Sequence, residues 1–423
     1  MTPESWAFVI IAPILFAITL PALVRQSSRE GDPTLLRFLV FALLLKLIVG
    51  TLLRYYVTFY VYERADAAGY VREGTEIAQQ MSQGAYHFSW GALSGTQTIS
   101  FLTGVVFRFL GPTTLGGFLI FSWLAFWGMF LFYRAFVLAV PEGRSRTYAR
   151  LLFLLPTIWY WPSSIGKEAW MIFALGIAAF GAARALSRDT LRGITIAGLG
   201  LWLMLFVRPH MAGMFGVGFL AAFLVKRAVG SERSYGLVWK AIGVVVVGVL
   251  AVVLVYRTAE FLNIEPTPSG AVSGLREVST RSDYGGSRFT PIVVSTPLRV
   301  PAAIVTVLFR PFVTETDNAQ ALAAALESLF LLLLTLKRLP WLLAAVRSCR
   351  RQPYVALALV YSIVFVIAYA SFPNFGLLAR ERTQLLPFYL ILLSIPAVRA
   401  RNEEASDSDG KSDRKLVSAA PLA

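Results

Sequence analysis

The chain has a single cysteine and two histidines among 423 residues, and only 15% of its residues are charged. One cysteine, Cys349, cannot form an internal disulfide or a metal site built from several thiolates. With only His87 and His210, a histidine-based metal site is not expected either. Because soluble domains carry about 25% charged residues, the scarcity of charge argues against a soluble globular protein.

The motifs of several enzyme classes are also absent. The sequence contains no G-x-x-x-x-G-K-[ST] phosphate loop, no G-x-G-x-x-G after a strand, no H-E-x-x-H and no C-x-x-C. It therefore gives no indication of a P-loop ATPase, a zinc protease or a dithiol redox enzyme.

Hydrophobic residues make up 57% of the chain and occur in long runs. A helix that crosses a bilayer needs about 20 predominantly apolar residues. The runs predict an all-α polytopic integral membrane protein with about eleven transmembrane helices in one domain, 1–398. The polar, mixed-charge segment 399–423 is expected to be a disordered cytoplasmic tail. The expected helices are 5–24, 36–54, 113–133, 149–162, 168–186, 192–208, 211–225, 239–257, 318–336, 352–371 and 383–398.

The loops between these helices alternate in charge, which predicts their orientation. Loops at 25–29, 134–150, 184–192, 226–240 and 337–351 are strongly basic and are expected in the cytoplasm. This dispersed charge accounts for the net charge of +15, so a nucleic-acid partner is not predicted. The segment 98–110 carries Arg108 and is expected to lie in the membrane interface rather than to cross.

Five polar clusters fall on the opposite, outer face in this topology. We expect them to form a site built from separate loops, because basic residues are normally biased to the inner face. The clusters are Arg64-Ala65-Asp66 to Tyr70, Gly166-Lys167-Glu168, Arg208-Pro209-His210, Arg281-Ser282-Asp283-Tyr284 and Arg380-Glu381-Arg382.

Asp66 is the strongest candidate for a catalytic residue. It follows an aromatic run from Tyr55 to Tyr62 that is typical of the membrane interface. A carboxylate just beyond the hydrocarbon edge could deprotonate an acceptor hydroxyl whose donor is held in the bilayer. The alternative is a solvated loop aspartate that pairs with Arg64 or Arg72.

Four basic residues and one histidine are candidates for contacts with a phosphate. Lys167 follows a turn too short to protrude, and its alternative is a lysine that snorkels to the interface. Arg380 and Arg382 suit bidentate contacts to phosphate, the alternative being a salt bridge through Glu381. Arg208 and His210 lie between two expected spans, where a cation usually has a partner, whereas a lone histidine is more often structural.

The remaining candidates are contacts to the donor or the acceptor. Tyr70 and Glu168 lie beside the residues above, although Glu168 also suits the start of a helix. For Arg281, Asp283 and Tyr284 the favoured interpretation is a solvated loop with a local ion pair.

This arrangement resembles the GT-C superfamily of polytopic glycosyltransferases. The resemblance rests on an aspartate near the start of a large outer loop, in Ala65-Asp66-Ala67-Ala68-Gly69-Tyr70, and on basic residues in later outer loops. The segment from Asn374-Phe375-Gly376 to Arg380-Glu381-Arg382 is also similar to late loops of bacterial membrane proteins that make surface polysaccharides.

The resemblance implies an inverting glycosyltransferase of the cell envelope, in the bacterial plasma membrane, with its active face outside. The donor would be a polyprenyl-phosphate sugar and the acceptor a lipid-linked or polymeric glycan. Asp66 would be the base, and Arg208, Arg380 and Arg382 would hold the lipid phosphate, with Lys167 as a further contact. No cofactor is certain, and because the site has no Asp-Asp or Asp-x-Asp pair, dependence on a divalent metal stays open.

Three alternatives stay open beside this interpretation. A polysaccharide polymerase or ligase with a lipid-diphosphate donor could use arginines without a catalytic aspartate. A transporter or flippase would place its site near the midplane, often between internal repeats, and no repeat is evident. A membrane-embedded assembly subunit would have no chemistry of its own.

Overall fold

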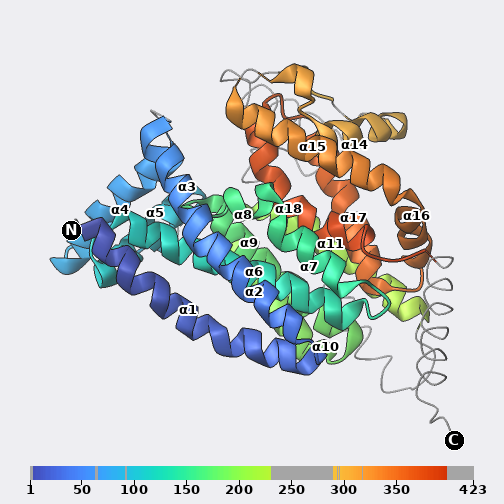
Figure 1. The fold of residues 1–423 in the computed structure, drawn as a ribbon, viewed down its shortest axis with the longest axis horizontal. Helices are drawn as coiled ribbons and strands as arrows, with labels where there is room; N and C mark the ends of the chain where they lie inside the picture. Colours follow the sequence, from blue (N-terminus) through green and yellow to red (C-terminus); the bar gives the residue numbers. More distant parts are fainter. Residues whose placement is uncertain are drawn as a thin grey trace, which may run out of the picture.

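The computed structural model describes residues 3–61, 65–90, 93–229, 289–292, 294, 296–316 and 318–397, and its regular elements are helices (Figure 1). The N-terminal helices are α1 Pro3–Glu30, α2 Pro33–Leu44, η1 Leu45–Gly50, α3 Thr51–Tyr56, η2 Val57–Val61, α4 Asp66–Ser82 and α5 Thr96–Leu110. The central helices are α6 Thr114–Ala139, α7 Ser145–Leu154, α8 Pro156–Tyr160, α9 Lys167–Ser187, α10 Thr190–Leu205 and α11 Pro209–Val229. The C-terminal helices are η4 Pro297–Arg299, α14 Val300–Phe309, η5 Val313–Glu315, α15 Ala319–Lys337, α16 Leu339–Ser348, α17 Pro353–Tyr369 and α18 Phe375–Leu392.

The number of candidate membrane spans is lower than the eleven predicted. Among the described residues, six helices are long and apolar enough to cross a membrane, or seven if the bent pair α16 and α17 forms one span. The predicted span 149–162 is divided between α7 and α8 at Pro156, and α10 has only 16 residues. The span predicted at 383–398 belongs to α18, which starts eight residues earlier, at Phe375, and carries three adjacent charges. Residues 239–257 and 399–423 lie outside the described residues.

The outward faces of α1 and α15 identify this as an α-helical membrane protein. On α1, Ile10, Ile14 and Ile18 are each more than half exposed, and on α15 so are Leu333 and Leu336. Continuous apolar faces of this size are rare on soluble monomers. A bilayer would cover them.

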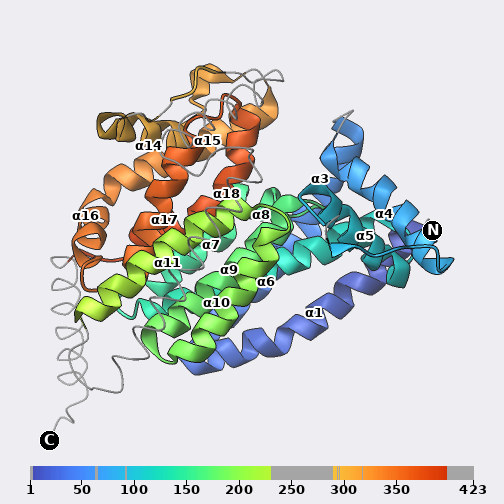
Figure 2. The ribbon, with the colours of Figure 1, turned by 180° about the vertical axis from the view of Figure 1, so that it is seen from behind.

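Helices α6 and α9 form the centre of the bundle, with α14 to α17 on one side and α1, α4 and α5 on the other (Figures 1 and 2). Helix α10 packs against α9 from outside. The backbones of these three helices meet at glycines. A Cβ atom on Gly176 of α9 would lie 2.4 Å from the carbonyl oxygen of Gly128 of α6, and one on Gly181 would lie 2.2 Å from the amide nitrogen of Ala197 of α10. Small residues drive association of membrane helices because they permit such close approach.

Helices α4 and α5 form a hairpin beside the end of α3 (Figure 1). Gly74 and Gly104 make the close contacts, and the hydroxyl of Ser100 donates to Glu73. Thr98 donates to the carbonyl oxygen of Phe206 at 2.9 Å, which ties α5 to the end of α10. At 15 residues α5 is shorter than a span, and its place in the interface stays a prediction.

The loops predicted to be cytoplasmic meet at the end of the bundle that lies away from the cavity described below. The amide of Arg144 and the guanidinium of Arg338 donate, each at 2.9 Å, to the carbonyl oxygens of Ser394 and Leu393 beyond α18. Lys226 donates to the carbonyl oxygen of Ala185 near the end of α9 at 2.6 Å. Cations at helix C-termini donate hydrogen bonds to carbonyl groups that have no partner within the helix. They also interact favourably with the negative end of the helix dipole.

Substituting Gly176 tests the packing of α6 against α9. We expect Gly176→Ala to lower the melting temperature in detergent by several degrees, because overpacking costs about 1–3 kcal/mol. Gly198→Ala in α10 is the matched control, since no atom lies within 4 Å of the added methyl group. The control should be neutral or slightly stabilising. Equal melting temperatures for the two variants would contradict close packing at Gly176.

Candidate functional site

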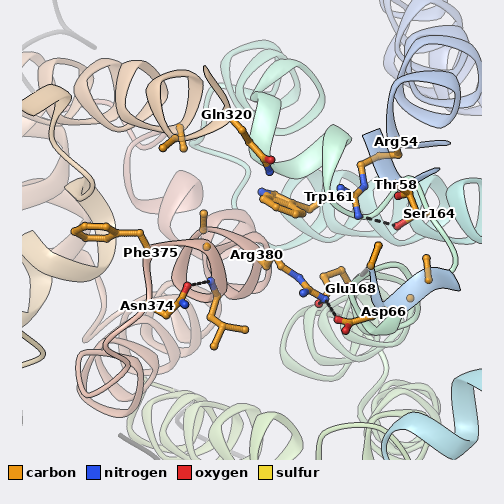
Figure 3. A pocket seen from close by; sticks show the side chains of 18 of the residues that line it. Arg54, Thr58, Asp66, Trp161, Ser164, Glu168, Gln320, Asn374, Phe375 and Arg380 are labelled. Carbon is orange, nitrogen blue, oxygen red and sulfur yellow. Dashed lines mark hydrogen bonds and ion pairs between the residues drawn. The ribbon is translucent and has the colours of Figure 1, made fainter. Parts of the chain in front are cut away.

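A cavity of about 370 Å³ lies where the loops at one end of the bundle converge (Figure 3). Its wall combines α3 and η2, the start of α4, residues 161–168, residues 311–324 and the start of α18. Apart from α3, η2 and α4, which follow one another, these segments lie far apart in the sequence. Four of them come from loops predicted to share one face. The lining includes Arg54, Thr58, Asp66, Tyr70, Trp161, Ser164, Glu168, Asn374, Phe375 and Arg380.

Arg380 of α18 lies at the centre of this wall. Its Nη2 is 2.9 Å from Oδ2 of Asp66 and 3.2 Å from Oε1 of Glu168 (Figure 3). The charge of Glu168 and, against the effect of burial, that of Asp66 raise the pKa of Arg380, so its guanidinium stays charged. The Asp66 side chain is 58% exposed. Its carboxylate is therefore accessible from the cavity although it is paired.

Behind Arg380, the ion pairs continue into the protein. Nη2 of Arg208 lies 3.0 Å from the same Oε1 of Glu168 and also contacts Glu381. Glu381 accepts a further hydrogen bond from Gln384 at 2.9 Å. The result is a chain of alternating charge, Asp66–Arg380–Glu168–Arg208–Glu381, which we call the ionic chain. Burying a carboxylate or a guanidinium is unfavourable, and partners of this kind offset the loss of hydration.

Helix ends place the members of the ionic chain. Asp66 is the first residue of α4 and Glu168 the second of α9, positions where the helix dipole favours a carboxylate. Arg208 lies directly before α11, and Arg380 and Glu381 lie in the second turn of α18. A Cβ atom on Gly166 would be only 3.2 Å from Oε2 of Glu168. Glycine at this position therefore leaves room for the carboxylate.

Tyr70, one turn after Asp66, is buried in the cavity wall. Burial, and then the carboxylates of Glu168 and Asp66, raise the pKa of its hydroxyl well above the ordinary value. The phenol therefore stays protonated and can donate a hydrogen bond, but it is not a base near neutral pH.

The structure separates the predicted phosphate contacts. Arg380 lines the cavity, whereas Arg208 lies behind it in the ionic chain. Lys167 is the first residue of α9, beside Glu168 but not part of the cavity lining. His210 has its Nε2 3.1 Å from the hydroxyl of Tyr369, which in turn lies 3.4 Å from Glu381.

Arg382 points away from the cavity. It is fully buried and donates to the carbonyl oxygen of Leu308 at 2.8 Å and to Ser328 at 3.0 Å. It therefore ties α18 to the end of α14 and to α15. Glu381 pairs with Arg208 rather than with either neighbouring arginine, because adjacent helical residues point in different directions. Arg281, Asp283 and Tyr284 lie outside the described residues.

Two cations of the predicted span 36–54, Lys46 and Arg54, were not among the predicted site residues. Lys46 is fully buried and donates to the carbonyl oxygens of Trp159 and Pro162 and to the hydroxyl of Ser163, at 3.1 to 3.3 Å. Arg54 lines the cavity beside Trp161. Their position within an apolar run of the sequence could have identified them. Charged residues within membrane helices are rare and usually have a function or a partner.

Comparisons with known proteins give no relative. No protein-family model, curated protein or solved structure matches the chain. No group of three or more histidine, cysteine, aspartate or glutamate side chains suited to a metal ion occurs in the described part of the chain.

Removing Arg208 tests whether the ionic chain supports the fold. We expect Arg208→Met to lower the melting temperature strongly, because breaking a buried ion pair costs about 3–5 kcal/mol. Adding Glu381→Gln should restore part of the loss, since it removes the charge of the carboxylate whose ion pair is broken. Glu168 still pairs with Arg380 in this variant. Arg192→Met is the control: its side chain is 79% exposed and its pair with Asp189 is a surface pair. A double variant no more stable than Arg208→Met would contradict the coupling.

Proposed function

We propose that the protein is a membrane glycosyltransferase of the GT-C type, with a polyprenyl-phosphate sugar as donor and a lipid-linked or polymeric glycan as acceptor. The observation that carries the proposal is the cavity in which an exposed carboxylate, Asp66, lies beside the partly buried guanidinium of Arg380. A site of this kind offers a base and a fixed positive charge in one space next to the membrane.

In the proposed reaction, the acceptor hydroxyl attacks the anomeric carbon of the donor sugar from the face opposite the phosphate. Asp66 takes the hydroxyl proton as the new carbon–oxygen bond forms. The bond to the phosphate oxygen breaks, and the phosphate leaves with the electron pair, so the configuration inverts. Fixed positive charges beside the leaving group stabilise the charge that develops on it.

Arg380 has two roles in this proposal. Its contact with Asp66 orients the base, and its charge faces the cavity in which the phosphate departs. Glu168 holds Arg380, and Arg208 holds Glu168, so the ionic chain keeps the pair in place before substrate binds. Lys167, which lies beside Glu168, would add positive charge to the same region. Catalysis benefits from such preorganisation because no charged group has to move during the reaction.

A second candidate is the polymerase or ligase with a lipid-diphosphate donor. It is favoured by the 2.9 Å pair between Asp66 and Arg380, because a carboxylate held by a guanidinium is also suited to a purely positioning role. In that enzyme arginines alone would stabilise the diphosphate. The two proposals differ in what Asp66 contributes.

For either enzyme we propose the bacterial plasma membrane, with the cavity on the extracytoplasmic side. The support is the charge of the loops: the end of the bundle opposite the cavity carries Arg144, Arg146 and Arg338, as expected of a cytoplasmic surface.

The test is sugar transfer in proteoliposomes from a panel of labelled polyprenyl-phosphate sugars. We expect Asp66→Asn to lower the rate about 10²–10⁴-fold, the contribution of a general base. Glu76→Gln is the matched control, the same chemical change at an exposed position of the same helix. Its rate should equal that of the wild type.

The outcomes separate the candidates. A normal rate for Asp66→Asn would remove Asp66 as the base and favour the polymerase. Loss of transfer in Glu76→Gln as well would mean that α4 tolerates no change of charge, and the role of Asp66 would then not be supported.

A further inference from the structure

Arg54 is a buried cation inside a membrane span. It belongs to α3, which runs between two π-helical segments, η1 and η2, within the apolar helix Pro33–Val61. The residue is only 9% exposed, yet it lines the cavity (Figure 3). π-Helical turns inside longer helices are often found at functional sites.

The contacts of Arg54 hold its guanidinium in place without neutralising it. The guanidinium carbon lies 5.0 Å from the ring centre of Tyr160 and 4.9 Å from that of Trp161. Two long hydrogen bonds, of 3.4 and 3.5 Å, reach the hydroxyls of Tyr160 and Ser164. Its buried Nε has no hydrogen-bond partner, and none of the described carboxylates forms an ion pair with it.

Lys46, eight residues earlier in the same span, is a buried cation with a purely structural role and can be compared with Arg54. Its ammonium group is bonded to three oxygen atoms of the segment 159–163, as many as it has donors. Arg54 contacts the same segment, but its contacts are aromatic rings and distant hydroxyls.

The arginines of the ionic chain, by contrast, already have carboxylate partners. In the ionic chain, the two guanidiniums of Arg208 and Arg380 share three carboxylates. An incoming anion would meet unfavourable negative charge near Asp66 and Glu168. At Arg54 it would meet a desolvated positive charge whose partner is missing from the described residues.

We propose that Arg54 binds the phosphate of a lipid phosphate monoester, with Ser164 and Trp161 completing the site. The inference rests on the proposed function and extends it, because it moves the main phosphate contact from the ionic chain to α3. A guanidinium presents two parallel donors to a phosphate, and in Arg54 the Nε edge is the one without a hydrogen-bond partner.

The surroundings of Arg54 favour a lipid over a soluble phosphate. On the same helix, Leu52 and Leu53 are each 41% exposed and Tyr56 is 57% exposed. The hydrocarbon chain of a bound lipid could pack against these exposed leucines while its phosphate contacts Arg54. Tyr56 is of the residue type that is enriched at the membrane interface. Arg380 is then left to hold Asp66.

Ligand-induced stabilisation tests the site without any need for turnover. The full chain in maltoside detergent is heated with farnesyl phosphate, with inorganic phosphate or with farnesol. We expect farnesyl phosphate alone to raise the melting temperature, because a ligand stabilises the state that it binds. Arg54→Gln should weaken the apparent affinity at least tenfold, and Arg54→Lys should weaken it less. Arg192→Gln, a change at an exposed arginine, should leave it unchanged.

The melting temperature without ligand distinguishes binding from support of the fold. If the role of Arg54 is to bind an anionic ligand, the ligand-free Arg54→Gln variant should be at least as stable as the wild type. The substitution removes a buried charge that has no partner in the absence of ligand. A marked loss of stability would assign Arg54 a structural role and overturn the proposal, as would wild-type affinity for farnesyl phosphate in Arg54→Gln.

The remaining outcomes concern the source of the phosphate and the proposed function. Equal stabilisation by inorganic phosphate, lost in Arg54→Gln, would overturn the lipid part of the proposal. Equal stabilisation by farnesol would overturn recognition of the phosphate. Binding that depends on Arg54 in a protein that transfers no sugar would support this site and contradict the glycosyltransferase instead.

Discussion

The arrangement of the cavity depends on one buried carboxylate oxygen. Oε1 of Glu168 lies 3.0 Å from Nη2 of Arg208 and 3.2 Å from Nη2 of Arg380. Through these two contacts α9 is joined to the connection between α10 and α11 and to α18, and Arg380 extends the link to α4. Because Glu168 is buried, losing either contact would leave its charge partly uncompensated, which is strongly unfavourable. These ion pairs therefore link all four segments in the folded protein.

The position of Glu168 depends in turn on how closely α9 packs. Glycines at its contacts with α6 and α10 let three backbones approach to distances that a methyl group would prevent. Such packing fixes the height and rotation of α9, and with them the direction of its N-terminal carboxylate. Small residues thus determine the geometry of the site from a distance, as is common where lipid supplies no hydrophobic driving force between helices.

Much of the architecture was predictable from the sequence, but the pairing of its charges was not. Apolar runs in the sequence predicted α1, α6, α9, α11 and α15. The charges of the loops predicted that Asp66, Glu168 and Arg380, which line the cavity, belong to the same face. Arg54 was not predicted as a site residue because it lies at the end of an apolar run, which was assigned as a whole to a membrane span. The pairing of Arg208 with Glu381 joins residues far apart in sequence, so local spacing could not reveal it. Arg382 was misplaced because residues two positions apart on a helix differ by about 200° in direction, so Arg380 and Arg382 point to nearly opposite sides.

The three hydrogen bonds of Lys46 have a consequence for the thermodynamics of recognition. They fix the backbone of residues 159–163 against the span that carries Arg54, with no ligand involved. The ring of Trp161 and the hydroxyl of Ser164 adjoin that fixed segment, so one wall of the cavity is rigid before anything enters it. The conformational entropy of this wall is lost during folding and does not oppose association. In the proposed binding of a lipid phosphate, selectivity can then come from shape and charge rather than from induced fit.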